Sequence, residues 1–426
     1  MGIENFISWY VSRQASRYFS FENGGSIEPP PAPDRPIHLY IHIPFCAELC
    51  PYCSFHRVPF MEPLAREYFS ALKQELGMYR DRGFSFSGVY IGGGTPTVLP
   101  DELFDLLSLI TGDFSPSEIS VETNPDRLDR GMLKRLADAG VSRVSVGIQT
   151  FDDQILKAVG RYEKYGSGPH LKERLTEAKG IVNTLNTDMI YNFPIQSLKM
   201  LESDLETLMD VGPDQITFYP LMVSDLTRGK MKGIMGRVDH SKEKRFYEAI
   251  TSYLDGRYEP NSAWCFSKAG TSMIDEYIVS ADEYLGVGSG AFGLVGGRIY
   301  ANTFSLPLYA ERIRQGKFPL SARKIFSARE LSRYAFLMGL FGLSINLNSF
   351  RSRFKAPLWR LLGPELLFFS LAGAVRREGE KLVLTRKGQY YWVAMMREFF
   401  TGVDNFRDLS REAAGIRQPP DGLSSH

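Results

Sequence analysis

Residues 37–55, IHLYIHIPFCAELCPYCSF, carry three of the protein's four cysteines. The first half of this stretch, residues 37–45, is an apolar run with the length and composition of a buried β-strand. Cys46, Cys50 and Cys53 therefore lie in a C-x3-C-x2-C pattern just past the C-terminal end of a strand. Three thiolates on one short loop can converge on a common centre, and such soft ligands favour iron-sulfur clusters, zinc or copper(I).

The alternatives to an iron-sulfur cluster fit this pattern less well. A structural zinc site wants a fourth Cys or His ligand, and His56, although near, is expected to leave on the far side of the loop. Three buried free cysteines, or a disulfide plus a spare thiol, are weak interpretations because a lone cysteine elsewhere and no signal peptide indicate a reducing cytoplasm. A cubane cluster with three protein ligands leaves one iron open for a small molecule, which is a catalytic arrangement.

The residues around the cysteines carry a family resemblance. Tyr52 precedes the last cysteine, and the flanks read YIHIPFC and CPYCSF. The chain thus resembles the radical S-adenosylmethionine (SAM) superfamily, in the HemN-like branch that contains oxygen-independent coproporphyrinogen III oxidase, the haem chaperone HemW and class C radical SAM methyltransferases. The resemblance implies that Cys46, Cys50 and Cys53 ligate three irons of a 4Fe-4S cluster while SAM chelates the fourth. One electron would then cleave SAM to a 5′-deoxyadenosyl radical.

Length and composition limit the other possibilities. At 426 residues, one large domain plus a smaller one is expected. A net charge of +1 shows no excess of basic residues of the kind that nucleic-acid-binding proteins carry. No window approaches the ~20 apolar residues of a membrane span, and the amphipathic, arginine-containing N-terminus does not read as a signal peptide. We therefore predict a cytoplasmic protein whose N-terminal segment packs on the main domain, with peripheral membrane contact as the alternative.

Strand and helix patterns alternate through the first half of the chain. Six strands are expected at residues 37–45, 86–92, 118–122, 141–149, 187–193 and 214–221. Such alternation predicts an α/β fold with parallel strands joined by helical crossovers. The resemblance implies a partial (β/α)6 radical SAM barrel. We assign residues 1–36 to an N-terminal helix and proline-rich linker, and residues 37–326 to the radical SAM core and its extension.

The barrel pattern is lost after residue 326. Helical patterns and a hairpin at residues 375–385 predict a small C-terminal winged-helix-like domain at residues 327–410, as HemN-like proteins have. We expect this domain to close the substrate pocket. The polar tail, residues 411–426, is expected to be disordered.

Loops after the strands of a parallel barrel build its active site. The segment GGGTPT at residues 92–97 follows the second strand, and its missing side chains would let backbone amides approach a ligand closely. The glycine string LGVGSGAF at residues 285–292 resembles one that closes the core near SAM in this branch. The SAM-binding residues implied by the resemblance are Tyr40, Tyr52, Gly93, Gly94, Thr95, Glu122, Gln149, Arg161, Asp188 and Gly288.

The branch contains three activities, which the sequence separates in part. The haem motif H-N-x-x-Y-W of HemW-like proteins is replaced by MIDEY at residues 273–277, although Cys265, expected to be a buried apolar residue, is a conceivable axial ligand. The further cysteine that the porphyrinogen oxidase carries after the cluster motif is absent. The strings CPYCSF, MIDEY and YWVAMMREFF most resemble the menaquinone methyltransferases, which include the menaquinone C8-methyltransferase group.

We therefore expect methylation of an sp2 carbon of a flat aromatic substrate, menaquinone at C7 or C8, with a second SAM as methyl donor. The alternatives are coproporphyrinogen oxidase-like or other tetrapyrrole chemistry, and haem binding by a HemW-like chaperone. The expected partners are an apolar quinone or tetrapyrrole and an electron donor such as flavodoxin or ferredoxin. Asp275, Glu276 and Tyr277 are candidates for the base only because of their position in the sequence.

Overall fold

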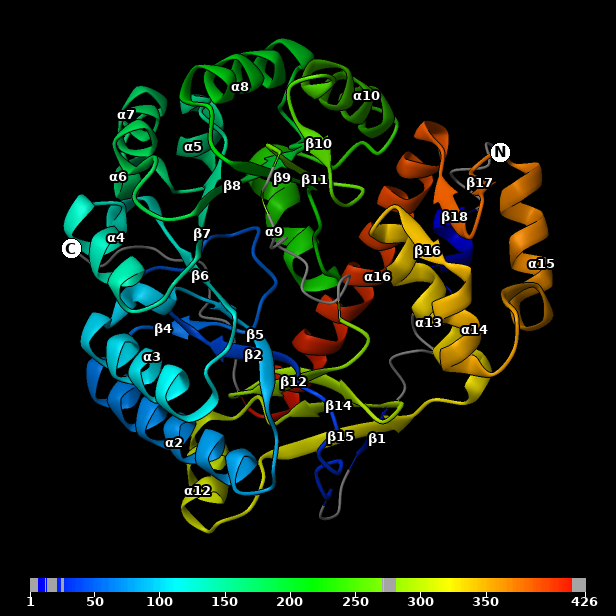
Figure 1. Ribbon diagram of the computed structural model, residues 1–426. Coiled ribbons are helices and arrows are strands. Elements are labelled where there is room, and N and C mark those ends of the chain that lie inside the picture. The colour runs from blue at the N-terminus through cyan, green and yellow to red at the C-terminus, as the bar shows by residue number, and fades with distance from the viewer. Residues whose placement is uncertain are drawn as a thin grey trace.

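Six parallel strands form the centre of the fold, and helices surround them (Figure 1). The computed structural model describes residues 7–11, 13, 21–23, 27–269, 271 and 281–415. The central strands are β2 (Ile37–Ile43), β5 (Phe86–Gly93), β6 (Glu118–Thr123), β7 (Arg143–Gln149), β8 (Thr184–Tyr191) and β9 (Gln215–Pro220). Each pairs in parallel with the next in chain order, which confirms the predicted set of strands.

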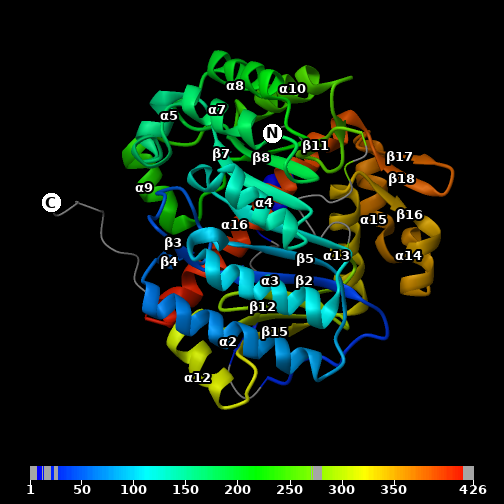
Figure 2. The same cartoon turned by 60° about the vertical axis from the view of Figure 1, so that its left-hand side comes forward.

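The connecting helices cover the outer face of these strands (Figures 1 and 2). They are α2 (Glu62–Arg80), α3 (Pro100–Phe114), α4 (Arg130–Asp138), α5 (Asp153–Ala158), α6 (Tyr162–Tyr165), α7 (Gly168–Ala178) and α8 (Leu198–Val211), with single turns η1 (Pro96–Val98) and η2 (Pro125–Arg127). In α3, Leu103, Leu106, Leu107 and Ile110 recur every three or four residues and are fully buried. This spacing places them on one face of the helix, which packs on the sheet.

The sheet continues beyond the six strands at both edges, an extension that the sequence does not predict. The added strands are β12 (Tyr284–Val287), β13 (Phe292–Val295), β14 (Arg298–Asn302), β15 (Leu320–Ile325) and β1 (Glu22–Asn23) beside β2, and β11 (Cys265–Ser267) and β10 (Glu259–Pro260) beside β9. β12 is parallel to β2, whereas all the other added pairings are antiparallel. In the described part of the chain the two outermost strands do not pair, so the barrel stays open.

The C-terminal domain lies beside this open side (Figure 1). It consists of α13 (Ala328–Phe341), α14 (Leu347–Phe354), α15 (Leu358–Leu371), α16 (Arg386–Ala413) and a three-stranded sheet of β16 (Ser344–Asn346), β18 (Lys381–Leu384) and β17 (Val375–Glu378). β17 and β18 confirm the predicted hairpin. The predicted boundary of the tail is wrong for residues 411–413, because α16 continues to Ala413 and Arg411 is buried.

Other helices complete the core, and residues 7–11 pack onto it. These helices are α9 (Asp225–Met235), α10 (Glu243–Leu254) and α12 (Leu306–Arg314). Residues 7–11 are helical, Ile7 is buried, and Ser8 Oγ accepts a hydrogen bond from Arg397 Nη2. The packing expected of the first segment is thus observed for its described residues. Among the helices that the structure describes, none combines the length and apolar character needed to cross a bilayer.

Candidate active site

The three cysteines of the C-x3-C-x2-C pattern lie on one loop directly after β2. Cys46 belongs to β3 (Phe45–Cys46), which pairs with β4 (Val58–Pro59) and closes the base of the loop. The closure is fixed by two backbone hydrogen bonds, from Val58 N to Pro44 O at 2.7 Å and from Phe60 N to Cys46 O at 2.8 Å. Residues 46–57 therefore form a short loop, named here the cysteine loop.

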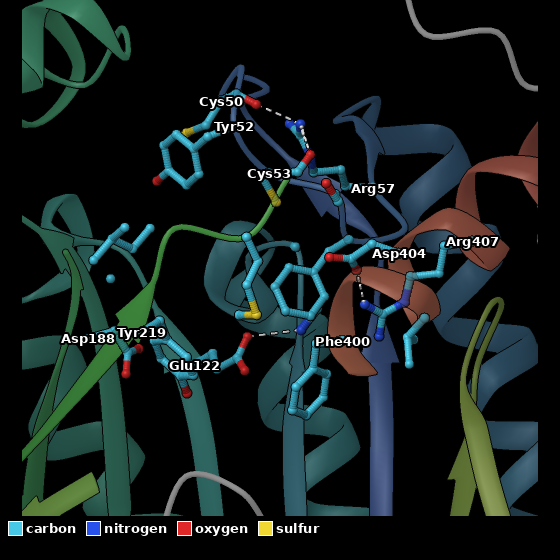
Figure 3. Close-up of a pocket in the computed structure, with 18 of the residues that line it drawn as sticks. Cys50, Tyr52, Cys53, Arg57, Glu122, Asp188, Tyr219, Phe400, Asp404 and Arg407 are labelled. Atoms are coloured by element: carbon cyan, nitrogen blue, oxygen red, sulfur yellow. Dashed lines mark hydrogen bonds and ion pairs between the residues drawn. The ribbon is translucent and has the colours of Figure 1, made fainter. Parts of the chain in front are cut away.

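A buried arginine holds the cysteine loop from within. Arg57 Nη2 donates to the carbonyl oxygens of Cys50 and Cys53, each at 2.6 Å, and Arg57 Nε donates to Cys53 O at 3.2 Å. One planar guanidinium thus bridges two turns of the loop, which a flexible ammonium group does less well. Figure 3 shows Arg57 between the two cysteines. Its positive charge lies where thiolates would bind a cluster.

Polar neighbours also contact the sulfur atoms. Arg161 Nη1 lies 3.6 Å from Cys50 Sγ, and Thr95 Oγ1 lies 3.7 Å from Cys46 Sγ. Burial raises the pKa of the Cys50 thiol, but the charges of Arg161, Lys164 and Arg57 outweigh this effect and lower that pKa overall. The surroundings of Cys50 therefore favour the thiolate, the form that ligates metal.

The donor set fits a cubane cluster better than a single metal ion. Across the described residues, no three His, Cys, Asp or Glu side chains converge closely enough to hold one ion. A cubane takes each cysteine on a different iron, so its ligands lie further apart than those of one ion. His56 offers no fourth ligand to the loop, since its Nε2 lies 3.1 Å from Ser289 Oγ and its ring stacks on His42. As expected, His56 points away from the cysteines.

The cysteine loop opens onto a pocket of about 340 Å³. Figure 3 shows Cys50 and Cys53 at one end, Glu122 and Asp188 at the strand ends, and Phe400 of α16 on another side. The predicted SAM and cluster residues that line the pocket are Tyr40, Cys46, Cys50, Tyr52, Cys53, Gly93, Gly94, Glu122, Gln149, Arg161 and Asp188. The structure thus brings together eleven predicted residues from the cysteine loop, strands and following loops.

The strand-end residues are held in place by their neighbours. Glu122 accepts hydrogen bonds from Tyr90 Oη at 2.8 Å and from Gly93 N at 2.9 Å. A Cβ atom at Gly92 would lie 2.6 Å from Glu122 Oε1, so a larger residue here would displace this carboxylate. Gln149 has a positive φ of 76°, a strained conformation that clusters at functional sites. These features hold the polar side chains at one wall of the pocket.

Asp188 and Arg161 complete the polar wall. Asp188 accepts hydrogen bonds from Ser145 Oγ at 2.8 Å and Asn186 Nδ2 at 2.7 Å. Arg161 donates to the carbonyl of Gly147 and remains buried, with no hydrogen-bond partner recorded for its Nε. The Arg161 guanidinium lines the pocket with its Nη1 at the cysteine end, and its positive charge is suited to an anionic ligand there.

Two of the predicted SAM contacts do not line the pocket. Thr95 instead contacts Cys46 Sγ and accepts a hydrogen bond from Asn124 Nδ2 at 2.8 Å. Gly288 is buried, and its N–H donates to Glu75 Oε2 at 2.9 Å. A Cβ at Gly288 would lie 2.5 Å from Tyr68 Oη, so close packing explains this glycine. The base candidates Asp275, Glu276 and Tyr277 lie outside the described residues.

Backbone amides of the glycine segment are also less available than expected. The N–H groups of Gly94 and Thr95 donate to the carbonyls of Ile43 and Phe45. A Cβ at Gly94 would lie 2.6 Å from Phe45 O. The glycines thus allow the segment to pack against the start of the cysteine loop, while Gly93 and Gly94 still border the pocket.

The remaining wall of the pocket is aromatic and aliphatic, and sequence reasoning did not assign most of it. Its members are Tyr219, Leu221, Met222, Trp264, Tyr284, Phe292, Ile299, Tyr334, Phe399, Phe400 and Val403. The neighbouring charged pair is Asp404 and Arg407, joined at 2.8 Å. Burial raises the pKa of Asp404 to about 6, although the Arg407 charge lowers it. Phe400, Asp404 and Arg407 recur every three or four residues of α16, a spacing that could have marked a common helix face.

The side chains of the YWVAMMREFF string, residues 391–400 of α16, divide between the pocket and the hydrophobic core. Phe399 and Phe400 line the pocket, whereas Trp392 and Met396 are fully buried in the hydrophobic core. Cys265 is also buried and does not line the pocket, which confirms the expectation for this residue.

Comparisons with known proteins agree with this geometry. The model of the Radical SAM superfamily matches residues 40–208. The chain is 30% identical over 366 residues to the heme chaperone HemW of Bacillus subtilis (strain 168), covering 82% of this chain and 95% of that protein. It is 28% identical over 324 residues to an oxygen-independent coproporphyrinogen III oxidase of Cereibacter sphaeroides, covering 70% of this chain and 71% of that protein.

A solved structure shares the fold. Coproporphyrinogen III oxidase (HemN) from Escherichia coli, described as a radical SAM enzyme, superimposes with a TM-score of 0.71 over 93% of both chains at 19% identity. This confirms the α/β radical SAM fold that the resemblance implied. The chain therefore belongs to the HemN-like branch of the radical SAM superfamily, whose cofactors are a 4Fe-4S cluster and SAM.

Proposed function

We propose that this protein is a radical SAM methyltransferase that methylates an sp2 carbon of a flat, uncharged aromatic substrate, with menaquinone at C7 or C8 as that substrate. The observation that carries the proposal is the aromatic and aliphatic wall of the pocket. Its charged pair, Asp404 and Arg407, is mutually neutralised. Such a wall provides burial for an apolar ring but little charge for an ionic one.

The polar end of the pocket is assigned to the cofactors. In this proposal Cys46, Cys50 and Cys53 hold the cluster, Arg161 binds the SAM carboxylate, and the strand-end wall contacts the SAM amino group and ribose. When bound, the cluster and SAM supply a 5′-deoxyadenosyl radical that abstracts a hydrogen atom. The chain itself orients SAM at the cysteine loop and holds the substrate ring against α16, away from bulk water.

The proposed reaction replaces one ring hydrogen with one methyl group. A hydrogen atom would be taken from the methyl group of a second SAM, and the resulting carbon would bond to the ring. The ring would lose its hydrogen as a proton, the new carbon would gain one proton as its bond to sulfur breaks, and S-adenosylhomocysteine would depart. An external reductant such as flavodoxin or ferredoxin would supply two electrons, one to cleave the first SAM and one for this release. Asp404 is the carboxylate beside the apolar wall, and its raised pKa suits a proton acceptor. Asp275, Glu276 and Tyr277 remain candidates from the sequence.

The charges of the pocket argue against the coproporphyrinogen oxidase-like alternative, in which the tetrapyrrole substrate would bring four carboxylates into the pocket. Three guanidinium groups line it in the described chain, and this proposal, which gives Arg161 to the SAM carboxylate, leaves none of them for a substrate carboxylate. Arg57 donates to the carbonyls of the cysteine loop, Arg161 contacts Cys50 and Gly147, and Arg407 pairs with Asp404. Burying unpaired carboxylates beside these groups would be unfavourable.

A tetrapyrrole is the second candidate, and the relatives favour it. The proteins similar to this chain include a heme chaperone and a coproporphyrinogen III oxidase, and neither name refers to methylation. Haem binding would require an axial ligand; no histidine lines the pocket in the described chain, although Met222 and Tyr219 do. The buried Cys265 does not line it either. The lining of the pocket therefore favours a quinone as the substrate, whereas the similar proteins favour a tetrapyrrole.

Mass spectrometry of quinones distinguishes these candidates. The gene would be expressed in a host that makes ordinary menaquinone, beside its Cys50→Ala form and a Cys265→Ala control. We expect a gain of one methyl group that requires Cys50 and tolerates the change at Cys265, because Cys50 lines the pocket and Cys265 does not. No change in quinone mass, with SAM still cleaved by the purified protein, would reject menaquinone in favour of a tetrapyrrole. Stoichiometric haem uptake without 5′-deoxyadenosine would favour the chaperone.

A further inference from the structure

Helix α15 of the C-terminal domain exposes three large apolar side chains. Trp359, Leu367 and Leu371 of α15 are 67%, 61% and 81% exposed. Only Leu358 and Leu362 of this helix are buried. α15 is kinked at Leu362, just before Pro364, so Trp359 lies in its first segment and Leu367 and Leu371 in its second. The four-residue spacing between Leu367 and Leu371 places these two side chains on one face of that second segment. α15 lies at the outer edge of the molecule (Figure 1), so these side chains do not belong to the pocket.

The same region carries excess positive charge. Residues 347–371 contain four basic residues and one acidic residue, although the net charge of the whole chain is only +1. Glu365 is paired with Arg333, and Arg353 is paired with Asp282. Arg351, Lys355 and Arg360 are exposed, and no ion pair with another described residue is recorded for them. The positive charge of these three side chains is therefore free to meet an external anion.

Exposed tryptophan and leucine beside unpaired basic side chains are typical of surfaces that bind the interface of a bilayer. We propose that α14 and α15 dock on an anionic lipid membrane. Trp359, Leu367 and Leu371 enter the interfacial region, while Arg351, Lys355 and Arg360 contact lipid phosphates. We name these six residues the α14–α15 surface. The charge complementarity selects a lipid headgroup surface over an apolar protein partner. The inference does not rest on the proposed methylation, because it concerns a face distinct from the pocket.

Vesicle flotation tests the proposal with the complete protein. We expect binding to vesicles of phosphatidylglycerol and phosphatidylcholine, no binding to phosphatidylcholine alone, and weakening by salt. Reversing charge in Arg351→Glu/Lys355→Glu/Arg360→Glu should weaken binding more than about 100-fold, because loss of each basic residue near an anionic surface costs roughly fivefold and the new acidic side chains add repulsion. Leu367→Ser/Leu371→Ser should weaken it about tenfold through loss of buried apolar area.

Two controls separate docking from misfolding. Leu409→Ser alters a leucine that is 66% exposed on α16, outside the α14–α15 surface, and should bind like the unchanged protein. Trp359→Phe keeps apolar character but should abolish the blue shift of tryptophan fluorescence on vesicles, because Trp264 and Trp392 are fully buried. Trp9→Phe controls for the other exposed tryptophan.

Three results would overturn the proposal. The first is absence of binding to anionic vesicles, and the second is equal binding by the unchanged protein and the charge-reversed variant. The third is a concentration-dependent dimer, seen by sedimentation, that the Leu367→Ser/Leu371→Ser variant abolishes. In that case a second copy of the chain, rather than a lipid surface, would cover α15.

Discussion

Arg57 provides the sharpest test of how this fold builds its site, because one side chain spans the cysteine loop. Arg57→Gln removes the charge and the hydrogen bonds to the carbonyls of Cys50 and Cys53. A hydrogen bond from a charged donor contributes about 1.5–3 kcal/mol net. Losing two such contacts, with some replacement by water, should destabilise the loop by about 3 kcal/mol, or about 100-fold in cluster retention. Arg57→Lys keeps the charge without the planar fork and should lose about tenfold.

The assay is the rate at which the anaerobically reconstituted protein loses its cluster to a chelator, followed by visible absorbance and by iron content. Cys50→Ala should fail to retain the cluster, whereas Arg66→Lys alters an exposed arginine of α2 and should behave like the unchanged protein. Circular dichroism of the cluster-free variants checks that each still folds. Unchanged iron content and an unchanged rate of loss in Arg57→Gln would refute a structural role for Arg57 in the loop.

Three further predictions concern the core and the pocket. Burial raises the pKa of the Glu75 carboxyl from 4.5 to about 7. Between these two pH values the folded protein therefore holds a proton on Glu75 that the unfolded chain releases. The free energy of unfolding should therefore fall by up to about 3 kcal/mol as pH rises through this window, a slope that urea titrations should not find in Glu75→Gln. Gly286→Ala should destabilise the fold by about 3 kcal/mol or more, because its Cβ would lie 2.0 Å from Phe292 O, whereas Gly112→Ala, with open space around it, should be neutral or stabilising in thermal unfolding. Phe400→Ala should lower kcat/KM for the substrate about 10- to 100-fold while 5′-deoxyadenosine still forms, and an equal loss of both products would contradict its place on the substrate wall.

The sequence predicts the parts of the fold that local pattern determines. The central strands alternate with amphipathic helices, and both signals extend over enough residues to be recognised. The cysteine loop is predictable because its three ligands lie within eight residues of one another, so their meeting needs no long-range folding. The hairpin of β17 and β18 is likewise local, with two residues between its strands.

Long-range pairing is what the sequence does not reveal. β12 and β13 have four residues each, and nothing in their composition shows that β12 joins the edge of β2, more than two hundred residues earlier. Resemblance predicts that Gly288 of the glycine string near them contacts SAM. In the structure Gly288 instead packs against Tyr68 and bonds to Glu75, because a strand must pass close to α2 there. A glycine in a motif thus indicates that another group packs closely against the backbone, but not whether that group is a ligand or a neighbouring side chain.

The C-terminal helix explains how one fold can keep its cluster chemistry while its substrate wall differs. Phe400 and Asp404 of α16 line the pocket, and one turn later Arg407 lies over Phe55 of the cysteine loop at 4.8 Å. Arg411 Nη2 then donates to Arg57 O at 3.3 Å. The side chains that shape the substrate wall are therefore on the same rigid element that contacts the cysteine loop. A change at position 400 alters what fits in the pocket without touching the cysteine ligands, whereas a change at Asp404 frees Arg407, which lies over the loop, and a change at Arg411 acts on the loop itself.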